Sequence, residues 1–235
     1  MQGMRVKLFA DGASIVEMID VYKRNLVQGF TTNPTLMKKA GVRDYLRFTQ
    51  EAIEALPDLP ISFEVLSDEF PEMERQARKI SGWGENVYVK IPITNARGDD
   101  ATPLVERLSH DAVKINVTAV LTLEQVEACV AAFSGGASGI VSVFAGRIAD
   151  TGRDPMPIMK KAVQIMRSCP NAEVLWASSR ELLNIYQAES CNCHIITVTN
   201  DILKKLPLVG MDLRELSLET VRMFLADAAQ AGFQL

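Results

Sequence analysis

The segment best suited to covalent chemistry is residues 87–94, VYVKIPIT, where one lysine interrupts an apolar run. Its β-branched and aromatic residues predict a strand buried on both faces. Alternation along a strand puts Lys90 on the face of Tyr88 and Pro92 and opposite Val89. Burial disfavours an ammonium ion, so a lysine on such a face is a candidate amine nucleophile for carbonyl carbons. The alternative is a lysine that snorkels to solvent or pairs with a carboxylate.

Two carboxylates, Asp11 and Glu64, stand at or near the ends of other apolar segments. Carboxylates on different strands can be held in different environments, so they can carry out different proton transfers. Further side chains at expected strand ends are Thr31, Asn33, Asn116, Thr118, Ser142 and Phe144. Each polar residue also has a structural reading, because Asp11 and Asn33 could be helix caps or turn residues. Glu64 could likewise form a structural pair with Lys90.

A cationic group follows later in the chain, at Arg147, Ser178 and Arg180. Guanidinium groups match the geometry of phosphate oxygens and bind them with paired hydrogen bonds. The three residues therefore predict a phosphate clamp, and the alternative is that the arginines are solvated and Ser178 belongs to a turn.

Strand and helix patterns alternate from end to end of the chain. Strands are expected at residues 6–11, 27–32, 61–66, 87–94, 113–117, 138–144, 173–177 and 193–198. Helices are expected at 14–25, 42–56, 68–80, 100–110, 122–133, 154–168, 179–189, 201–205 and 217–229. Eight alternating strands predict a single α/β domain, a (β/α)8 TIM barrel over residues 1–235 with a C-terminal helix at about 217–229. An open doubly wound sheet is the rival, but no G-x-G-x-x-G turn follows the first strand.

The bulk composition excludes several classes of partner. The 235 residues carry a net charge of −4, so neither nucleic acid nor an anionic membrane surface is expected as a partner. No apolar run reaches the length of a membrane span, and residues 1–10 lack the apolar centre of a signal peptide. A cytoplasmic location is expected, with the four cysteines as free thiols.

A metal site and a nucleophilic triad have little support. Cys191, Cys193 and His194 lie close together, but their spacing is not that of a zinc site, and no metal is expected. Neither His194 nor the second histidine, His110, stands in a recognisable Ser-His-Asp or Cys-His motif.

Five segments together resemble one known family. They are TTNPT at 31–35, VKIP at 89–92, NVT at 116–118, FAGR at 144–147 and ASSR at 177–180. In this order and spacing they look like the transaldolase and fructose-6-phosphate aldolase family, in its short form. The likeness runs from about Val6 to the terminal helix.

The resemblance implies a (β/α)8 barrel in which Lys90 forms a Schiff base with a ketone. It implies that Asp11 is the acid–base group for carbon–carbon cleavage, and that Glu64, with Thr118 and a water, moves protons during Schiff-base formation. The remaining roles that it implies are a dihydroxyacetone subsite of Asn33, Asn116 and Ser142, with Thr31 supporting Asp11 or the substrate, and a phosphate subsite of Arg147, Ser178 and Arg180. No cofactor is needed, because the lysine is the electron sink.

Three positions favour the transaldolase branch. Glu64, Phe144 and Asn116 stand where the aldolase branch typically has glutamine, tyrosine and glycine. A tyrosine could supply a proton that lets dihydroxyacetone leave, whereas phenylalanine has no proton to donate. We therefore expect transfer of a dihydroxyacetone unit from a ketose phosphate to an aldose phosphate acceptor.

Other readings stay open at the level of sequence. An aldolase that releases dihydroxyacetone is the first rival, and a non-catalytic sugar-phosphate-binding barrel is a rival of another class. Departures at Val143 and at residues 197–201 touch the rim of the expected site, so a related sugar, for example a sulfonated one, is a further alternative. The resemblance also implies a homo-oligomer using the terminal helix, where Leu218 and Phe224 belong to an apolar stripe; the alternative is that the stripe packs on its own barrel.

Overall fold

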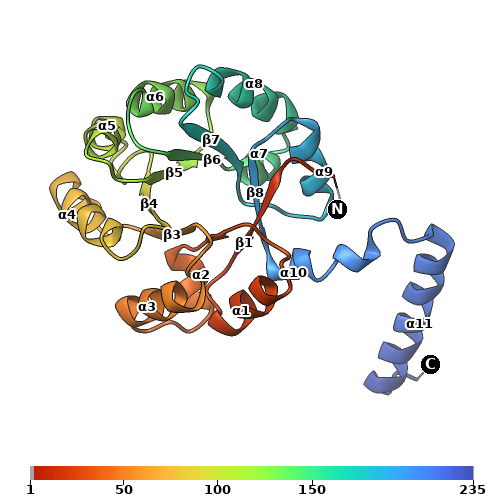
Figure 1. Cartoon of the computed structure of the whole chain (residues 1–235). Coiled ribbons are helices and arrows are strands. Elements are labelled where there is room, and N and C mark those ends of the chain that lie inside the picture. Colours follow the sequence, from red (N-terminus) through yellow and green to blue (C-terminus); the bar gives the residue numbers. More distant parts are fainter. Residues whose placement is uncertain (1–2, 235) are drawn as a thin grey trace. The chain divides into compact units, whose positions relative to one another are not determined.

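The computed structural model describes residues 3–234 and contains a closed barrel of parallel strands whose order around the barrel follows the chain (Figure 1). The strands are β1 (Lys7–Asp11), β2 (Phe30–Thr31), β3 (Ile61–Glu64), β4 (Val87–Pro92), β5 (Ile115–Val120), β6 (Gly139–Val143), β7 (Ala172–Trp176) and β8 (Ile195–Thr199). Pairing of β1 with β8 closes the sheet. The predicted (β/α)8 barrel is therefore confirmed, and the open doubly wound sheet is excluded.

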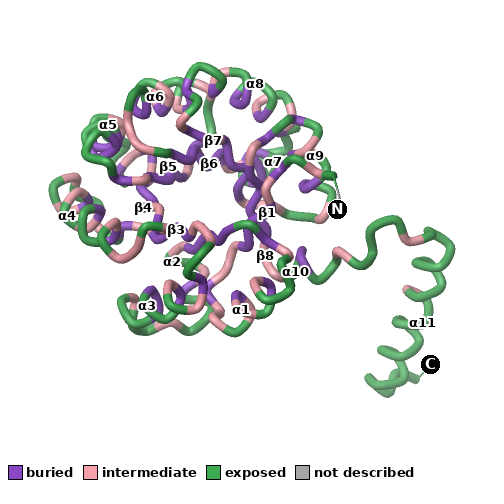
Figure 2. The backbone as a smooth tube through the Cα atoms, in the orientation of Figure 1, coloured by how far each residue is buried: buried purple, intermediate pink, exposed green. Residues whose placement is uncertain are grey.

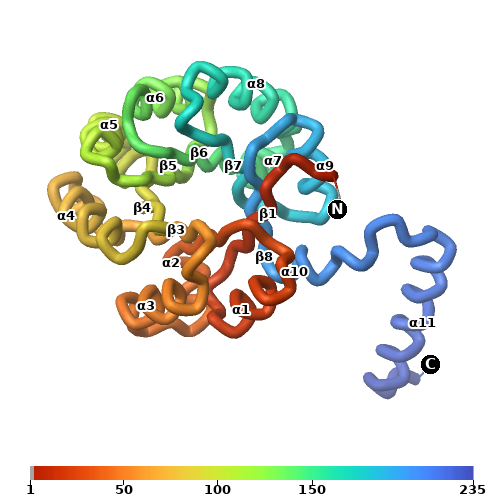
Figure 3. Tube along the Cα trace, viewed as in Figure 1, coloured from red at the N-terminus to blue at the C-terminus, as the bar shows by residue number. Residues whose placement is uncertain are grey.

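Helices follow the strands and surround the barrel, and the colours change steadily around the ring as the chain proceeds (Figure 1 and Figure 3). Those of the barrel are α1 (Ile15–Lys23), α2 (Pro34–Lys39), α3 (Tyr45–Ala55), α4 (Phe70–Ser81), α5 (Thr102–His110), α6 (Leu123–Phe133), α7 (Ala145–Asp150), α8 (Met156–Met166), α9 (Leu183–Ser190) and α10 (Asn200–Leu203). The sequence patterns did not anticipate α2 and α7. Both are short helices that begin directly after a strand, where the sequence had indicated only a turn or the strand end.

Contacts along the chain divide it into two units, the first ending at Leu203 and the second beginning at Lys204. The first unit is the barrel. The second holds the 3-10 turn η1 (Leu206–Leu208) and α11 (Leu213–Ala231), which includes the helix expected at 217–229. Asp212 caps the start of α11, and Gly232 ends it with a left-handed backbone, φ +67°. No helix within residues 3–234 combines the length and apolar character that crossing a bilayer requires.

Apolar side chains fill the part of the barrel interior beneath the carboxyl ends of the strands. This part is therefore a packed core rather than a channel. Phe9, Ile140, Leu175 and Ile195 belong to this layer, and Tyr88 packs against it. The strands are almost wholly buried, as Figure 2 shows in purple. Closer to the carboxyl ends, residues of the same strands line a cavity.

Candidate active site

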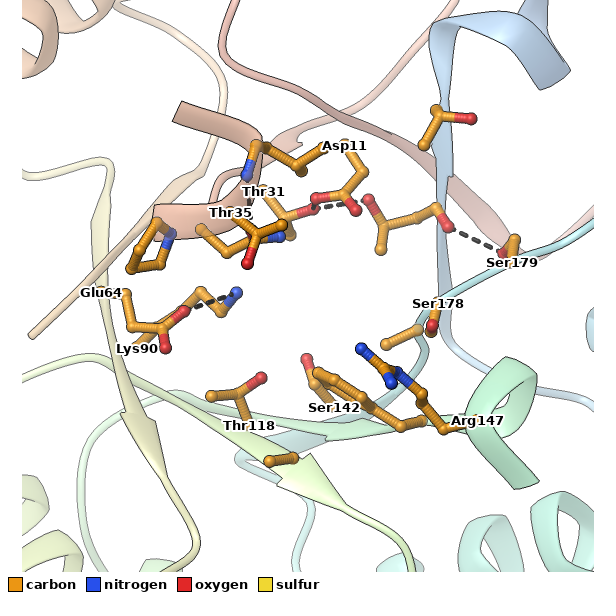
Figure 4. Close-up of a pocket in the computed structure, with 18 of the residues that line it drawn as sticks. Asp11, Thr31, Thr35, Glu64, Lys90, Thr118, Ser142, Arg147, Ser178 and Ser179 are labelled. Atoms are coloured by element: carbon orange, nitrogen blue, oxygen red, sulfur yellow. Dashed lines mark hydrogen bonds and ion pairs between the residues drawn. The ribbon is translucent and has the colours of Figure 1, made fainter. Parts of the chain in front are cut away.

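A cavity of about 430 Å³ lies at the carboxyl ends of the strands (Figure 4). Lys90 and Pro92 line it, whereas Tyr88, two residues earlier on β4, packs against the core. This agrees with the face assigned to Lys90 from strand alternation. The other sequence-predicted site residues on its wall are Asp11, Thr31, Asn33, Glu64, Thr118, Ser142, Phe144, Arg147, Ser178 and Arg180.

The Lys90 amine is buried, and it contacts two oxygen atoms. Its side chain is 7% exposed, and Nζ donates to the Thr32 carbonyl at 2.8 Å. Nζ also lies 3.2 Å from Glu64 Oε2. Glu64 comes from β3, directly beside Lys90 in the ladder. The carboxylate next to the amine can hold it as an ammonium ion and can also accept its proton, so the geometry suits both a structural pair and an activated nucleophile.

Asp11 is the second carboxylate of the cavity, and its surroundings differ from those of Glu64. Thr31 Oγ1 donates to Asp11 Oδ1 at 2.7 Å. Burial raises the pKa of Asp11, the positive charge of Lys90 and the Thr31 hydrogen bond oppose that rise, and the negative charge of Glu64 adds to it. A carboxyl group with a raised pKa can accept and return a proton near neutral pH more readily than an exposed one.

Thr118 faces the cavity from β5, on the same side of the strand as Asn116, and an irregularity in the strand follows it. The register with β6 shifts between Val117 and Val120, and Ala119 has a left-handed backbone, φ +59°. Such a bulge inserts one residue into the strand beyond Thr118. The Thr118 hydroxyl is buried and has no hydrogen-bond partner among the described residues. It is therefore a group suited to hold a small polar molecule at the cavity wall.

Asn116 is not on the wall of the cavity. Its Nδ2 donates to Ser62 Oγ at 3.0 Å, and its Oδ1 accepts a hydrogen bond from Ser142 Oγ at 2.7 Å. The side chain is fully buried. Asn116 stands beside Lys90 in the ladder, but its shorter side chain does not extend as far toward the strand ends. It orients Ser142, which does line the cavity.

The far wall carries the cationic group. Arg147, on α7, points into the cavity in Figure 4, across from Lys90. Ser178 follows β7 with a left-handed backbone, φ +63°, a conformation that concentrates at functional sites in residues other than glycine. Arg180 is held by Asp150, with Nε at 3.0 Å from Oδ1. The same pairing lowers the pKa of Asp150.

Close packing of α7 on the loop after β7 brings Arg147 and Ser178 together. A Cβ added to Gly146 would clash with the Ser178 carbonyl oxygen, which belongs to the backbone and cannot move aside as a flexible side chain could.

We expect Gly146→Ala to cost about 1–3 kcal/mol of stability, because overpacking forces backbone shifts. It should also raise the KM for an anionic substrate while leaving kcat less affected. The measurement is chemical denaturation together with steady-state kinetics, and an unchanged KM would contradict it. Gly152→Ala has open space around the added Cβ but a left-handed backbone, φ +78°, so it costs stability without contacting Ser178 and tests whether such a cost alone alters KM.

Several residues of the site were not singled out from the sequence. Thr197 and Ser62 are buried polar residues within strands, and strand alternation alone could have placed each on its face. Asp150 follows Arg147 by three residues, a spacing that puts both on one helix face and could have indicated an acid near the clamp.

The cysteine and histidine cluster near β8 serves the structure. The cysteines are buried free thiols, and His194 Nδ1 accepts the Val174 N–H at 3.0 Å. No group of three or more His, Cys, Asp or Glu side chains within residues 3–234 is placed to hold a metal ion.

Fold and cavity define the class: a (β/α)8 barrel with a polar cavity at the carboxyl ends of its strands. Solved barrels resemble it in fold alone, at low identity. Dihydrodipicolinate synthase from Rhodopseudomonas palustris has a TM-score of 0.57 and 13% identity, over 82% of this chain and 69% of that one. 3-Keto-L-gulonate-6-phosphate decarboxylase from Vibrio cholerae has a TM-score of 0.52 and 10% identity, over 83% and 88%.

The chain belongs to the transaldolase/fructose-6-phosphate aldolase family, whose model matches residues 8–235. A protein of Dehalococcoides mccartyi named "Probable transaldolase" is 34% identical over 202 residues, covering 86% of this chain and 90% of that one. A protein of the same name from a Thermoanaerobacter species is 35% identical, covering 86% and 89%. The family resemblance read from the five motifs is thereby confirmed.

Proposed function

We propose that the protein is a transaldolase, which transfers a dihydroxyacetone unit from a ketose phosphate such as fructose 6-phosphate or sedoheptulose 7-phosphate to an aldose phosphate. The observation that carries this proposal is the buried Lys90 amine, 3.2 Å from Glu64, in a cavity that also holds Asp11 and, on its far wall, Arg147. A nucleophilic amine, two carboxylates and an anion-binding wall are the parts that such a transfer needs. The family and the names of the relatives support the same reading.

The first step joins the substrate to the protein. Glu64 accepts a proton from Lys90, and the neutral amine adds to the ketone carbon of the substrate. The addition product loses its hydroxyl as water, with a proton supplied through Glu64, and leaves an iminium ion. The Thr118 hydroxyl is placed at the cavity wall to hold a water that carries these protons.

Asp11 then serves the cleavage step. Its carboxylate takes the proton from the hydroxyl on the second carbon beyond the iminium carbon. The bond then breaks between that hydroxyl-bearing carbon and the carbon adjacent to the iminium group. The electron pair moves into the iminium group and forms an enamine, while the severed half leaves as an aldehyde. The enamine attacks an acceptor aldehyde, Asp11 returns its proton to the new hydroxyl, and water releases the product from Lys90. No metal or organic cofactor takes part in this scheme.

The remaining residues hold the substrate. Asn33 Oδ1 accepts the Leu36 N–H at 2.9 Å in the first turn of α2. The amide nitrogen of Asn33 is then available to donate to a substrate hydroxyl. Ser142, oriented by Asn116, offers a second contact to the dihydroxyacetone unit. Arg147, Ser178 and Arg180 bind the phosphate and so fix the distance of the reacting carbons from Lys90.

An aldolase that frees dihydroxyacetone is the second candidate, and Phe144 argues against it. Phe144 lines the cavity and has no proton to donate to a departing dihydroxyacetone unit. The deciding experiment measures glyceraldehyde 3-phosphate release from fructose 6-phosphate, with and without erythrose 4-phosphate. Release that requires the acceptor supports transaldolase, whereas equal release without it would assign the protein to the aldolase branch.

Arg147 gives a test of the phosphate-binding wall. We expect Arg147→Ala to raise the KM for a phosphorylated ketose roughly 10- to 100-fold, since a hydrogen bond to a charged group contributes about 1.5–3 kcal/mol. The change in kcat should be smaller. Arg153→Ala is the matched control, because Arg153 is exposed nearby and donates to Thr151 instead. Equal effects of the two substitutions on KM would show that only general electrostatic attraction is involved.

A further inference from the structure

A short chain of hydroxyl groups leads from β8 to Asp11. Thr31 Oγ1 lies 2.7 Å from Asp11 Oδ1 and 2.6 Å from Thr197 Oγ1. Thr31 and Thr197 are both buried, at 3% and 4% exposure. Figure 4 shows Asp11 and Thr31 side by side at one wall of the cavity, with dashed lines marking hydrogen bonds between the residues drawn.

The hydrogens in this chain have only one consistent arrangement while Asp11 is ionised. A carboxylate can only accept hydrogen bonds, and a hydroxyl group has a single hydrogen to donate. The Thr31 hydrogen is therefore directed at Asp11 Oδ1. The contact between the two threonines then requires Thr197 to donate and Thr31 to accept. Accepting a hydrogen bond polarises the Thr31 hydroxyl and strengthens its own donation.

The main chain of Thr197 is anchored as well. Ser179 Oγ donates to the Thr197 carbonyl at 2.8 Å, and Thr197 stands opposite Phe9 in the ladder with β1. Ser179 lies between Ser178 and Arg180, which belong to the anion-binding wall proposed above. The same residue of β8 thus contacts the loop after β7 through its carbonyl group and the Asp11 side of the cavity through its hydroxyl group.

We propose that Thr197 is a positioning residue for the transfer reaction: by donating to Thr31, it fixes Asp11 Oδ1 as the held oxygen and leaves Oδ2 to exchange the proton with substrate. This inference rests on the function proposed above. It assigns a role in orienting the acid–base group to a residue that is one side chain removed from it.

The electrostatic setting of Asp11 gives the inference a pH-dependent readout. Burial is the largest influence on the pKa of Asp11, and it raises that pKa. Among charged groups, Lys90 from β4 lowers the pKa and Glu64 from β3 raises it. The Thr31 hydrogen bond lowers that pKa, so a weaker donor at Thr31 lets the pKa rise further. A neighbouring hollow that Asp11 also lines contains the charged residues Glu17, Lys39 and Asp201.

The experiment compares Thr197→Val with Thr197→Ser. Valine keeps the shape of the side chain and removes the donor, whereas serine keeps the donor. We expect Thr197→Val to lower kcat for transfer about tenfold, a part of the 10²–10⁴-fold that an acid–base group contributes. The acidic limb of its pH profile should move to higher pH, because the carboxylate form of Asp11 is needed to take the substrate proton. Thr197→Ser should keep the parental profile. Thr197→Ala, which also removes the hydroxyl, replaces the valine variant if that variant does not fold.

A second measurement separates this inference from the proposed function. Borohydride reduction in the presence of fructose 6-phosphate should trap the Lys90 adduct in the parental protein and in Thr197→Val alike, since Glu64 serves that step. Thr49→Val is the control, because Thr49 is fully buried on α3 and donates to the Leu46 carbonyl. It should lose comparable stability and keep the parental kcat and pH profile.

The outcomes are distinct. Parental kcat and pH profile in Thr197→Val would overturn the inference alone, as would equal losses in Thr197→Val and Thr197→Ser. A parental protein that neither traps an adduct nor transfers a dihydroxyacetone unit would overturn the proposed function and the inference with it.

Discussion

Replacing Lys90 with methionine is expected to abolish transfer, with kcat falling on the order of 10⁵- to 10⁶-fold, the scale of losing a covalent nucleophile. Methionine has nearly the length of lysine and fits a buried site, but it has no amine to form an iminium ion. Mass spectrometry after borohydride reduction should find a sugar-derived mass increase on the peptide containing Lys90 in the parental protein. The same treatment should leave the Lys90→Met variant unchanged.

Two comparisons separate loss of the Lys90 amine from a general loss of stability or of substrate binding. Lys79→Met removes an exposed lysine of α4 and should leave both kcat and the trapped adduct unaltered. Lys90→Met should still bind a sugar phosphate through Arg147, as measured by protection from thermal unfolding. Transfer activity retained in Lys90→Met would mean that Lys90 is not the nucleophile and only pairs with Glu64. A parental protein that binds a sugar phosphate but shows neither transfer nor a trapped adduct would favour a non-catalytic binding barrel.

Asp11→Asn is expected to separate the two halves of the reaction. Loss of the acid–base group should lower kcat by roughly 10²- to 10⁴-fold. The adduct with Lys90 should still form, because Glu64 moves the protons of that step, so the trapped adduct should accumulate. Quantifying adduct and product in the same sample tests both parts. If Asp11→Asn lost both the adduct and transfer, Asp11 would also be needed for Schiff-base formation, which contradicts our proposal.

The same substitution has a predictable effect on stability. Burial is the largest influence on Asp11 and raises its pKa above the ordinary value of 3.8. Between 3.8 and the raised pKa the folded state binds more protons than the unfolded state, so stability falls as pH rises through this window. Asparagine accepts the Thr31 hydrogen bond and has no charge to desolvate. Asp11→Asn should therefore have a higher Tm than the parental protein above the window and an equal one below it. A lower Tm at neutral pH would show that attraction to Lys90 outweighs burial.

The sequence accounted for the architecture and for most of the cavity wall. Alternating strand and helix patterns predict a barrel, and in a parallel barrel every strand end meets at one face. Residues at those ends, such as Asp11, Glu64 and Lys90, could therefore be grouped before their distances were known. Strand alternation also placed Lys90 on the inner face, since a period of two leaves only two choices.

The pairings around those residues could not be obtained in this way. The bulge at Ala119 adds a residue to β5 without a glycine to mark it, and it shifts the register with β6. The ion pair between Arg180 and Asp150 joins groups on α7 and on the loop after β7. Both depend on how separate segments pack, and local patterns carry no information on that packing.

The sequence by itself determined which side chains face inward, because side-chain direction follows from strand periodicity within a single segment. Only the tertiary structure decided how deep each lies and what it contacts, because depth depends on the register between strands and on side-chain length. Lys90 and Asn116 are neighbours in the ladder, yet the long lysine enters the cavity and the short asparagine stays beneath it. The link from Thr197 through Thr31 to Asp11 joins β8, β2 and β1, which meet only when the barrel closes.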